Sequence, residues 1–431
     1  MNDFLSNRHR KSLANFSLTG LILALSLLQP LAVFACGMSM IPSASSSGWT
    51  YGNDSAEQSF INYENGVEHL IISRSFENGS ANTVWVIPVP ASPTSVHVDV
   101  LSEDPKFSGY DVIAKAKGNI KTIKDELLST QIYPIIPKIL SSTFGLSGSI
   151  GSNAPRSSGI PQSAGSPSGV DVYEHIEKNG MTAEVLSATD SDALYAYLKE
   201  KGLNAEKNSI SILQNYIGKN FSFVATWVSS SSEKVQAKGV LMQFPTDKIF
   251  YPLKPESGTP GNGLPETITV VGHVTPNLYA NIKNSTYVDY YHSYGSSDLA
   301  GFFSSKGDFN YTKIVINTAP KNLIDDLYIS QNAPLKVMLA TSVSQYAFAY
   351  FLLLLLLISL VSSYLASLLL LADKRFSTIA KMTIASCFTL IGTIIGSRFF
   401  LQEKRFKFVV SFSLIFVVLT FVSWFLLSAV I

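Results

Sequence analysis

Two long uncharged segments near the C-terminus constrain this chain more than any other feature. Residues 337–372 contain no charged side chain and include the run FLLLLLLISLVSSYLASLLLLA, and residues 408–431 form a second apolar segment. A helix needs about 20 apolar residues to cross the hydrocarbon core of a bilayer. We therefore expect transmembrane helices at residues 345–372 and 408–431, which make the chain an integral membrane protein whose membrane contacts come from its C-terminal helices.

A shorter apolar segment lies between these two. Residues 382–397 are uncharged, which gives about 24 Å of helix against a hydrocarbon core of about 30 Å. Residues 378–398 are therefore expected to form either a short transmembrane helix, with Lys381 and Arg398 reaching the two surfaces, or a re-entrant helix. The apolar character on all sides favours three spans, whereas two spans would keep all seven basic residues of this region on one side of the membrane.

The N-terminus has the order of a secretory signal peptide. Three basic residues between positions 8 and 11 precede an apolar run at residues 16–28, and the small residues of LAVFA then lead to Cys36. This order predicts a cleaved signal peptide at residues 1–35. One alternative is an uncleaved anchor, which the short apolar run and Pro30 disfavour. The other is lipidation of Cys36, because VFAC is close to a lipoprotein cleavage box.

Charge is distributed unevenly along the chain. Residues 37–340 carry 28 acidic and 22 basic side chains, whereas the flanking segments carry 3 acidic and 10 basic ones. The middle region is therefore acidic and contains no basic patch. Nucleic acid is not an expected partner.

The middle region shows the pattern of many short strands with few helices. Alternating and β-branched runs, with turns at Asn65-Gly66 and Asn78-Gly79, predict a β-rich extracytoplasmic part at residues 36–140. A polar helix is expected near residues 111–128. The Ser-, Gly- and Pro-rich stretch at residues 141–169 predicts a linker, either between two structured parts or as a long excursion within one domain.

Residues 170–335 predict a second extracytoplasmic part. TDSDALYAYLKEKG, residues 189–202, is typical of a helix, with polar residues that can cap its start and Gly202 as its stop, and strands are expected on both sides of it. The predicted fold class is an α+β extracytoplasmic region, β-rich in its first part and mixed in its second, followed by a C-terminal transmembrane helical segment.

The run VWVIPVPASP, residues 84–93, is the least regular of the predicted strands. Pro88 and Pro90 remove backbone donors from the same strand edge, so that edge cannot be paired there. We predict a strand with Trp85 buried that runs into a stiff extended connection, and not a central strand. The alternative is that residues 88–93 belong to a peptide-docking edge.

Three blocks of the sequence together resemble a known family. They are WVIPVPASP at residues 85–93, preceded by the Cys36-Gly37 start, VLSATDSDALYAYLKEKGL at residues 185–203, and LQNYIGKNFSFVATWV at residues 213–228. In this order they resemble domain-of-unknown-function family 2330, a group of exported, often membrane-anchored bacterial proteins. MSM follows the first Cys-Gly here, where family members often have a Gly- and Cys-containing stretch.

The resemblance covers roughly residues 36–255 and implies a compartment but no reaction. Together with the signal peptide and the apolar segments, it predicts a protein of the bacterial cell envelope, held in the cytoplasmic (inner) membrane. Residues 36 to about 340 are expected on the extracytoplasmic side.

Few residues of the middle region point to chemistry. His97 and Asp99 share one face of a strand at i,i+2 and are weak candidates for a metal site, although this spacing also occurs on any solvated strand. His175, between Glu174 and Glu177, is expected in an exposed polar helix or loop. The sequence has no nucleophile elbow, metalloprotease motif or phosphate-binding glycine loop, so no cofactor is expected.

The stretch NLYANIKNSTYVDYYHSYGSSDLAGFF, residues 277–303, is rich in tyrosine. Tyrosines among small polar residues make rigid, amphipathic contact surfaces. The candidate binding residues are Tyr287, Tyr290, Tyr291, His292 and Tyr294. The alternative is that many of these rings fill the core of the second part.

Three functions are compatible with these observations. The first is a non-catalytic, membrane-anchored binding or assembly module with a protein partner in the envelope. The second is an extracytoplasmic hydrolase whose site forms only on folding, near His97 and Asp99. The third is an accessory subunit of a membrane complex. The absence of any catalytic motif favours the first.

Overall fold

The structure is a computed structural model of the 431-residue chain. The predicted signal peptide, Cys36 and all but the last residue of the predicted linker lie outside the residues that it describes. The described residues are 38–42, 49–51, 58–73, 84–129, 169–201, 211–228, 239–258, 265–296, 302–303, 307–370, 376–386, 389–401 and 403–427.

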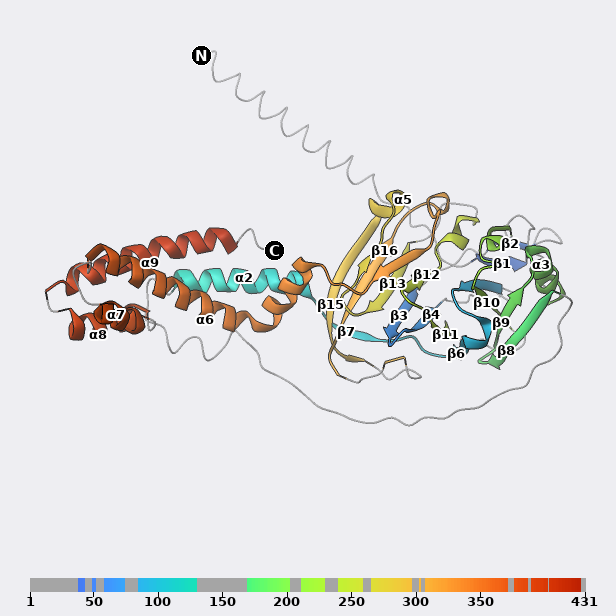
Figure 1. The fold of residues 1–431 in the computed structure, drawn as a ribbon. Coiled ribbons are helices and arrows are strands. Elements are labelled where there is room, and N and C mark those ends of the chain that lie inside the picture. Colours follow the sequence, from blue (N-terminus) through green and yellow to red (C-terminus); the bar gives the residue numbers. More distant parts are fainter. Residues whose placement is uncertain are drawn as a thin grey trace, which may run out of the picture.

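The molecule is elongated, with β-sheets at one end and a bundle of helices at the other (Figure 1). A six-stranded sheet has the order β2-β1-β5-β10-β9-β8, with every neighbouring pair antiparallel. Its strands are β1 (Met38–Pro42), β2 (Trp49–Tyr51), β5 (Val84–Val89), β8 (Val170–Lys178), β9 (Met181–Ala188) and β10 (Ser222–Val228).

An eight-stranded sheet has the order β6-β11-β4-β3-β13-β16-β15-β7, and only its β3–β13 pair is parallel. Its strands are β3 (Gln58–Glu64), β4 (Val67–Ser73), β6 (His97–Leu101), β7 (Phe107–Asp111), β11 (Gly239–Pro245), β13 (Glu266–Val271), β15 (Thr286–Ser296) and β16 (Phe309–Ile316). A small third sheet contains β12 (Ile249–Tyr251), β14 (Thr275–Pro276) and β17 (Leu327–Ser330).

The two large sheets pack over one apolar core. Alternate residues of each strand point into it, as the period of two in a strand requires. Trp85 and Ile87 of β5 enter from the six-stranded sheet, and Leu70 and Ile72 of β4 enter from the eight-stranded one. The fold is therefore mixed α+β with a β-rich N-terminal half, as the sequence predicts.

The two parts that flank the predicted linker are interleaved in shared sheets. β5, from before residue 141, pairs along its length with β10, and β4 pairs with β11, from after residue 169. Strands from both predicted parts, residues 36–140 and 170–335, therefore lie in the same sheets. Strand pairing between distant segments leaves no local signature in a sequence, so neither partner indicates the other.

β5 is the strand that contains VWVIPV. Its first three residues, Val84 to Val86, lie between β1 and β10, so the prediction that this is not a central strand is wrong for that half. Among the described residues, Pro88 is paired only with β10, which is a position that a residue without a backbone donor tolerates. Trp85 is buried, with 3% of its surface exposed.

Short helices cover the outer face of the six-stranded sheet. The predicted helix at residues 189–202 is present as α3 (Ser191–Glu200), and its start is capped by the Asp190 carboxylate, which accepts from the Ala193 N–H at 2.8 Å. Leu194 and Leu198 of α3 pack with Leu213 of the 3₁₀ helix η2 (Ser211–Asn215) against this face. Further short helices are η1 (Pro93–Ser95), η3 (Lys254–Gly258), η4 (Pro320–Asn322) and α5 (Ala280–Lys283).

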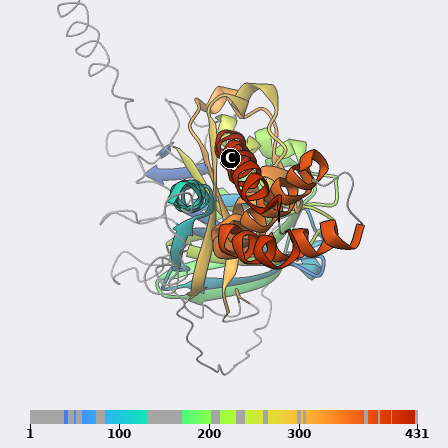
Figure 2. The ribbon, with the colours of Figure 1, turned by 90° about the vertical axis from the view of Figure 1, so that its left-hand side faces the viewer.

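Two helices of the described chain are long and apolar enough to cross a membrane. They are α6 (Leu335–Leu370) and α9 (Arg405–Leu427), in the regions where the sequence predicts transmembrane helices. They run antiparallel: Lys404 Nζ, just before α9, donates to the carbonyl oxygen of Leu370 at 3.0 Å, and Leu427 packs beside Ala340 and Val343 near the start of α6. Figure 2 shows these helices end-on, in front of the sheets.

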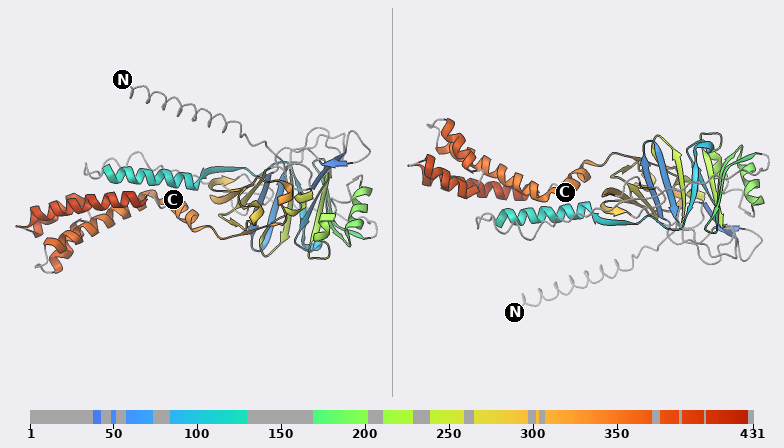
Figure 3. Two further views of the ribbon diagram at one scale, coloured as in Figure 1. Left: turned by 90° about the horizontal axis from the view of Figure 1, so that it is seen from above. Right: turned by 90° about the horizontal axis from the view of Figure 1, so that it is seen from below.

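The segment at residues 378–398 forms two helices in place of the expected one. They are α7 (Phe376–Ser386) and α8 (Thr389–Phe400), at the end of the bundle remote from the sheets (Figure 3). At 1.5 Å per residue their lengths are about 17 and 18 Å, well below the roughly 30 Å of a bilayer core. Neither helix alone is long enough to cross.

The polar helix predicted near residues 111–128 is present as α2 (Val112–Ser129), and it lies alongside α6 and α9 and not on the sheets (Figures 1 and 3). Its apolar residues at helical spacing face α6. Asn119 Nδ2 donates to the carbonyl oxygens of Val343 and Ser344, each at 3.1 Å, one turn before α6 kinks at Tyr346 (φ −118°, ψ 31°). α2 thus joins the sheets to the helices.

Candidate functional site

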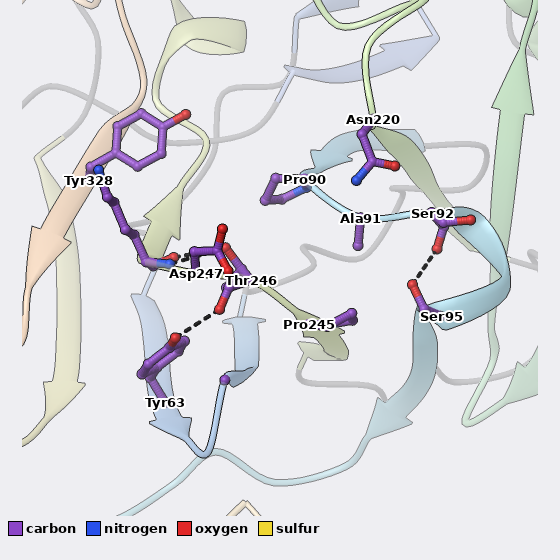
Figure 4. Close-up of a pocket in the computed structure, with 12 residues that line it drawn as sticks. Tyr63, Pro90, Ala91, Ser92, Ser95, Asn220, Pro245, Thr246, Asp247 and Tyr328 are labelled. Atoms are coloured by element: carbon purple, nitrogen blue, oxygen red, sulfur yellow. Dashed lines mark hydrogen bonds between the residues drawn. The ribbon is translucent and has the colours of Figure 1, made fainter.

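A pocket of about 680 Å³ lies where the ends of several strands meet (Figure 4). Its walls come from the connection after β5, the β3–β4 turn, the turn after β11, the start of β10 and β17. The volume lies within the range of small-molecule sites. The lining residues are Tyr63, Gly66, Pro90, Ala91, Ser92, Ser95, Asn220, Pro245, Thr246, Asp247, Lys248 and Tyr328.

One wall of the pocket is the second half of VWVIPVPASP. The Ala91 N–H donates to the carbonyl oxygen of Val89 at 2.8 Å, and the N–H and hydroxyl of Ser95 donate to the Ser92 carbonyl at 2.9 and 2.8 Å. These bonds, together with Pro90 and Pro93, fix the connection in one shape. The connection therefore serves both to carry the chain from one sheet to the other and to form a rigid pocket wall.

The opposite wall is the turn after β11, which is tied to the β3–β4 hairpin. The Thr246 N–H donates to the Gly66 carbonyl at 2.9 Å, and the Tyr63 hydroxyl donates to the Thr246 carbonyl at 2.7 Å. Asn65 (φ 54°) and Gly66 (φ 81°) adopt the positive φ values that a two-residue hairpin turn requires. The predicted Asn-Gly turn is thus present, and it supports the pocket.

Several polar groups of the pocket are free. Within the described part of the chain, the side chains of Asn220, Asp247 and Lys248 have no hydrogen-bond or ion-pair partner, and all three are exposed. Figure 4 shows Asn220, Ser92 and Ser95 on one side, and Tyr63, Asp247 and Tyr328 on the other. The pocket therefore offers hydroxyl groups, an amide, a carboxylate and an ammonium group to a ligand that lies between its walls.

The protonation of the pocket is set by burial. Partial burial, and then the carboxylates of Asp247 and Glu68, raise the pKa of Tyr63, so its hydroxyl remains a donor at neutral pH. Burial also raises the pKa of Glu68 well above its usual value, although the Phe250 N–H, which donates to Glu68 Oε2 at 2.8 Å, acts in the other direction. Asp247 is the acidic side chain among the residues that line the pocket.

Tyr328, on β17, is held by a buried carboxylate two residues before it. Asp326 accepts two contacts from the Tyr216 hydroxyl, at 2.9 and 3.0 Å, and one from the Lys254 N–H at 3.0 Å. Burial raises the pKa of Asp326 to about 6. These bonds tie β17 to η2 and η3 and so fix the third side of the pocket.

The tyrosine-rich stretch forms β15, and the strand divides its rings between two faces. Tyr291 stacks on Tyr311 with centroids 4.9 Å apart, on the opposite face from Tyr290, which meets His273 edge-on. Tyr287 is 66% exposed. The five candidate residues therefore do not form one site, and a binding role for them stays a prediction.

His292 and Tyr294 belong to a cluster at the junction with the helices. Both rings contact Tyr110, with centroids 5.3 and 5.5 Å apart, and Lys115 Nζ of α2 lies 3.8 Å from the centre of the Tyr110 ring. The Tyr110 hydroxyl lies 3.4 Å from Ser344 Oγ of α6. Two of the predicted binding residues, His292 and Tyr294, thus lie at the junction between the sheets and the helices, away from the pocket.

His97 and Asp99 both face β8, which closes the sandwich on that side. Lys178 Nζ contacts the Asp99 carboxylate at 2.7 and 3.0 Å, and His97 Nδ1 lies 3.5 Å from Glu174 Oε2. No group of three potential metal ligands occurs among the residues that the structure describes. The contacts of His97 and Asp99 hold two sheet edges together. A metal role for this pair stays a prediction.

His175 lies on β8, so its prediction as part of a polar helix or loop is wrong. Its Nδ1 lies 2.8 Å from the buried Glu184 carboxylate of β9, which also contacts Tyr197 and Lys201 of α3 and its C-terminal end. The alternation of exposed and half-buried residues in VYEHIEK, with the Asn179-Gly180 turn after it, is the strand signal in this stretch.

Most pocket residues have no signal in the sequence. Residues 88–93 are singled out as a docking edge, and they do form a wall, but Tyr63, Asn220 and Asp247 lie on segments far apart in the chain. The two turns at Gly66 and Thr246 become neighbours only because β4 pairs with β11. PTDK at the end of a strand, residues 245–248, is the one local signal of a polar turn in this part of the pocket.

The family model described as an uncharacterized protein conserved in bacteria (DUF2330) matches residues 30–257, just over half of the chain. The chain belongs to this family. The matched segment includes every pocket residue except Tyr328 and ends before α6 and α9. The pocket is therefore largely built from the family's own segment.

Comparison with other proteins adds no function. No curated protein matches the chain. A mutated baculovirus P35 after caspase cleavage is similar to it at 8% identity and a TM-score of 0.23, covering 65% of this chain and 100% of P35. Baculovirus P35 itself is similar at 11% identity and a TM-score of 0.24, covering 65% and 92%. At such low TM-scores the likeness carries no argument about fold or function.

Proposed function

We propose that this protein is a non-catalytic binding module of the bacterial envelope, anchored in the cytoplasmic membrane by α6 and α9, with its sheets on the extracytoplasmic side. The observation that supports it best is the pocket, where free polar side chains lie on a frame fixed by the Ser92, Thr246 and Asp326 hydrogen bonds. Rigid walls reduce the entropy lost on binding.

The composition of the pocket favours binding over hydrolysis. Its lining contains hydroxyl and amide groups, one carboxylate and one ammonium, with no histidine or cysteine among the lining residues. Hydrolysis by side chains requires a base beside a nucleophile, or two carboxylates. The adjacent Asp247 and Lys248 balance each other in charge, so the ligand is a polar molecule with little net charge.

The binding function is tested by blocking the pocket with a single substitution. The full chain in lipid nanodiscs is incubated with the small-molecule fraction of a bacterial envelope extract, washed, and its retained molecules are identified by mass spectrometry. Ser92→Trp places a large ring in the pocket, and Thr94→Trp, exposed on the same connection but outside the lining, is the matched control. Thermal unfolding checks that both variants fold.

We expect polar small molecules on the wild type and on Thr94→Trp, and their loss from Ser92→Trp. Equal retention by all three proteins, or no retention by the folded wild type, would refute the binding function.

The proposed orientation has its own test. Reporters that are active only in the cytoplasm are fused after Gln331, before α6, and after Lys374, after α6. The positive-inside rule places the basic residues that follow α6 in the cytoplasm. We expect activity at Lys374 alone, and activity at Gln331 would reverse the orientation.

A further inference from the structure

The α7–α8 pair forms a tight antiparallel hairpin. Thr393 Oγ1 lies 3.0 Å from Ser386 Oγ, and an added Cβ at Gly396 would lie 2.5 Å from the Cβ of Ala385. Gly392 and Gly396, four residues apart, give α8 a smooth face that lets the helices approach closely, as small residues do between helices in membranes. The hairpin is thus one packed unit, and neither helix is free to straighten into a span.

The outer surfaces of this hairpin are apolar. Ile384 is 65% exposed, Ile394 49% and Ile395 52%, and Leu390 and Ile391 are exposed beside them. These residues lie toward the closed end of the hairpin. From Lys381 to Ser386 the helix rises about 8 Å, which fits within the roughly 15 Å thickness of one leaflet's hydrocarbon.

Basic residues lie midway along α7, near the end of α8 and at the start of α9. Lys381, Arg398, Arg405 and Lys407 are all exposed, and Lys381 Nζ lies 5.7 Å from the centre of the Phe400 ring. Glu403 is the single acidic residue between position 376 and the C-terminus. These four basic residues, which we call the basic collar, adjoin the end of α6 and the start of α9, where Lys404 contacts Leu370.

We propose that the α7–α8 hairpin is a re-entrant element that enters one leaflet with its apolar closed end, and that its basic collar binds the headgroups of anionic phospholipids in that leaflet. The charge of the collar is complementary to phosphate. The collar is also continuous with the two helices that cross the bilayer, which places it at headgroup level. Clusters of four or more basic residues beside a spanning helix bind acidic lipids in this way.

The lipid preference is tested on the full chain in bicelles of phosphatidylcholine and phosphatidylglycerol in equal parts. The protein is extracted with mild detergent, and the lipids that stay bound are quantified by mass spectrometry. The collar variant carries Lys381→Gln, Arg398→Gln, Arg405→Gln and Lys407→Gln. The control variant removes four exposed charges in the region of the sheets, with Lys199→Gln, Lys219→Gln, Lys283→Gln and Lys321→Gln.

We expect enrichment of phosphatidylglycerol on the wild type and the control, and a fall of at least about tenfold on the collar variant, because each basic residue at a membrane surface strengthens anionic binding by roughly fivefold. Equal amounts of the two lipids on the wild type would overturn the proposal, and so would an equal fall in both variants.

The re-entrant geometry is tested separately by thiol labelling in intact cells, with Cys36 and Cys387 changed to Ser. Single cysteines are placed by Ser377→Cys, at the start of α7, and by Glu403→Cys, after α8; both positions are exposed. A hairpin that returns to the same surface makes the two sites react alike with a membrane-impermeant reagent, before and after lysis. Opposite responses would show that the segment crosses the bilayer and would refute the hairpin.

Discussion

The β-sheets and the C-terminal helices of this protein expose different kinds of side chain. Among the described residues before Leu335, the exposed large apolar side chains are four tyrosines and Ile324. α6 and α9, in contrast, expose leucines, valines and phenylalanines along their whole length. Exposed apolar surface on this scale is stable in lipid and not in water. The exposed surface of the sheets therefore suits water, and that of α6 and α9 suits lipid.

The two regions also differ in the polar side chains that they bury. The sheets bury carboxylates that accept hydrogen bonds, such as Glu68, Glu184 and Asp326. The buried polar side chains of α6 are all small hydroxyls, among them Ser359, Ser362 and Ser363. A serine hydroxyl can bond to the carbonyl of its own helix, as Ser362 does with Ile358 at 2.7 Å, whereas a charge would need a partner from elsewhere.

Trp85→Ala gives the largest expected effect and tests whether the shared core holds both sheets. Trp85 is 3% exposed in the core between them, and removing a ring of this size leaves a cavity. We expect a loss of about 3–5 kcal/mol in the free energy of unfolding of the sheets. The measurement is urea unfolding of the detergent-solubilised full chain, followed by near-ultraviolet circular dichroism.

Tyr287→Ala is the matched control, because this ring is 66% exposed on β15. It should change the free energy of unfolding by less than about 0.5 kcal/mol. Similar losses for the two variants would mean that the sheets share no single core.

Asp326 is a buried carboxyl in the region of the sheets, and its titration can be tested. Asp326 is 9% exposed, and burial raises the pKa of its carboxyl from 3.8 to about 6. A raised pKa in the folded state means that the stability associated with the protonated form is present below pH 4 and lost as the pH rises through 6. The loss is about 3 kcal/mol, from roughly 1.4 kcal/mol per pKa unit.

We expect Asp326→Asn to unfold with less dependence on pH between 4 and 7 than the wild type, because the amide does not titrate. The variant should still fold, since the amide oxygen can accept from Tyr216 and Lys254. Urea unfolding across this range measures it. Asp171→Asn, at an exposed position on β8 away from Asp326, should keep the wild-type dependence. Equal pH slopes for the wild type and Asp326→Asn would assign the titration to other groups.

Much of the architecture can be predicted from local patterns. Uncharged length gives α6 and α9, capping residues give α3, and Asn65-Gly66 gives the β3–β4 turn. Each of these signals acts within a few residues of the feature that it predicts. The missing elements are those defined by distant partners, such as the pairing of β5 with β10 across the residues that separate them.

The pocket shows the same limit more strongly. Residues 88–93 attract attention because two prolines interrupt a strand, but a proline-rich connection predicts only rigidity. The residues that make it one wall of a pocket, Tyr63 and Asp247, come from turns brought beside it by the sheet order. In the tyrosine-rich strand, period two sends neighbouring rings to opposite faces, so a cluster in the sequence is not one in space.

The smallest expected effect compares two glycines in the helical region. Gly396 of α8 faces Ala385, so Gly396→Ala would place two Cβ atoms 2.5 Å apart and force the hairpin open, with an expected loss of about 1–3 kcal/mol. Gly118 of α2 has open space around it, and Gly118→Ala should stabilise its helix by up to about 1 kcal/mol, because alanine loses less backbone freedom on folding. Thermal unfolding of the full chain in detergent, followed at 222 nm, measures both. Opposite signs are expected because α8 packs against another helix at Gly396, whereas a Cβ added at Gly118 of α2 would meet no other atom within 4 Å. A gain for Gly396→Ala would mean that the α7–α8 contact is loose, and the hairpin would then lose its claim to be a packed unit.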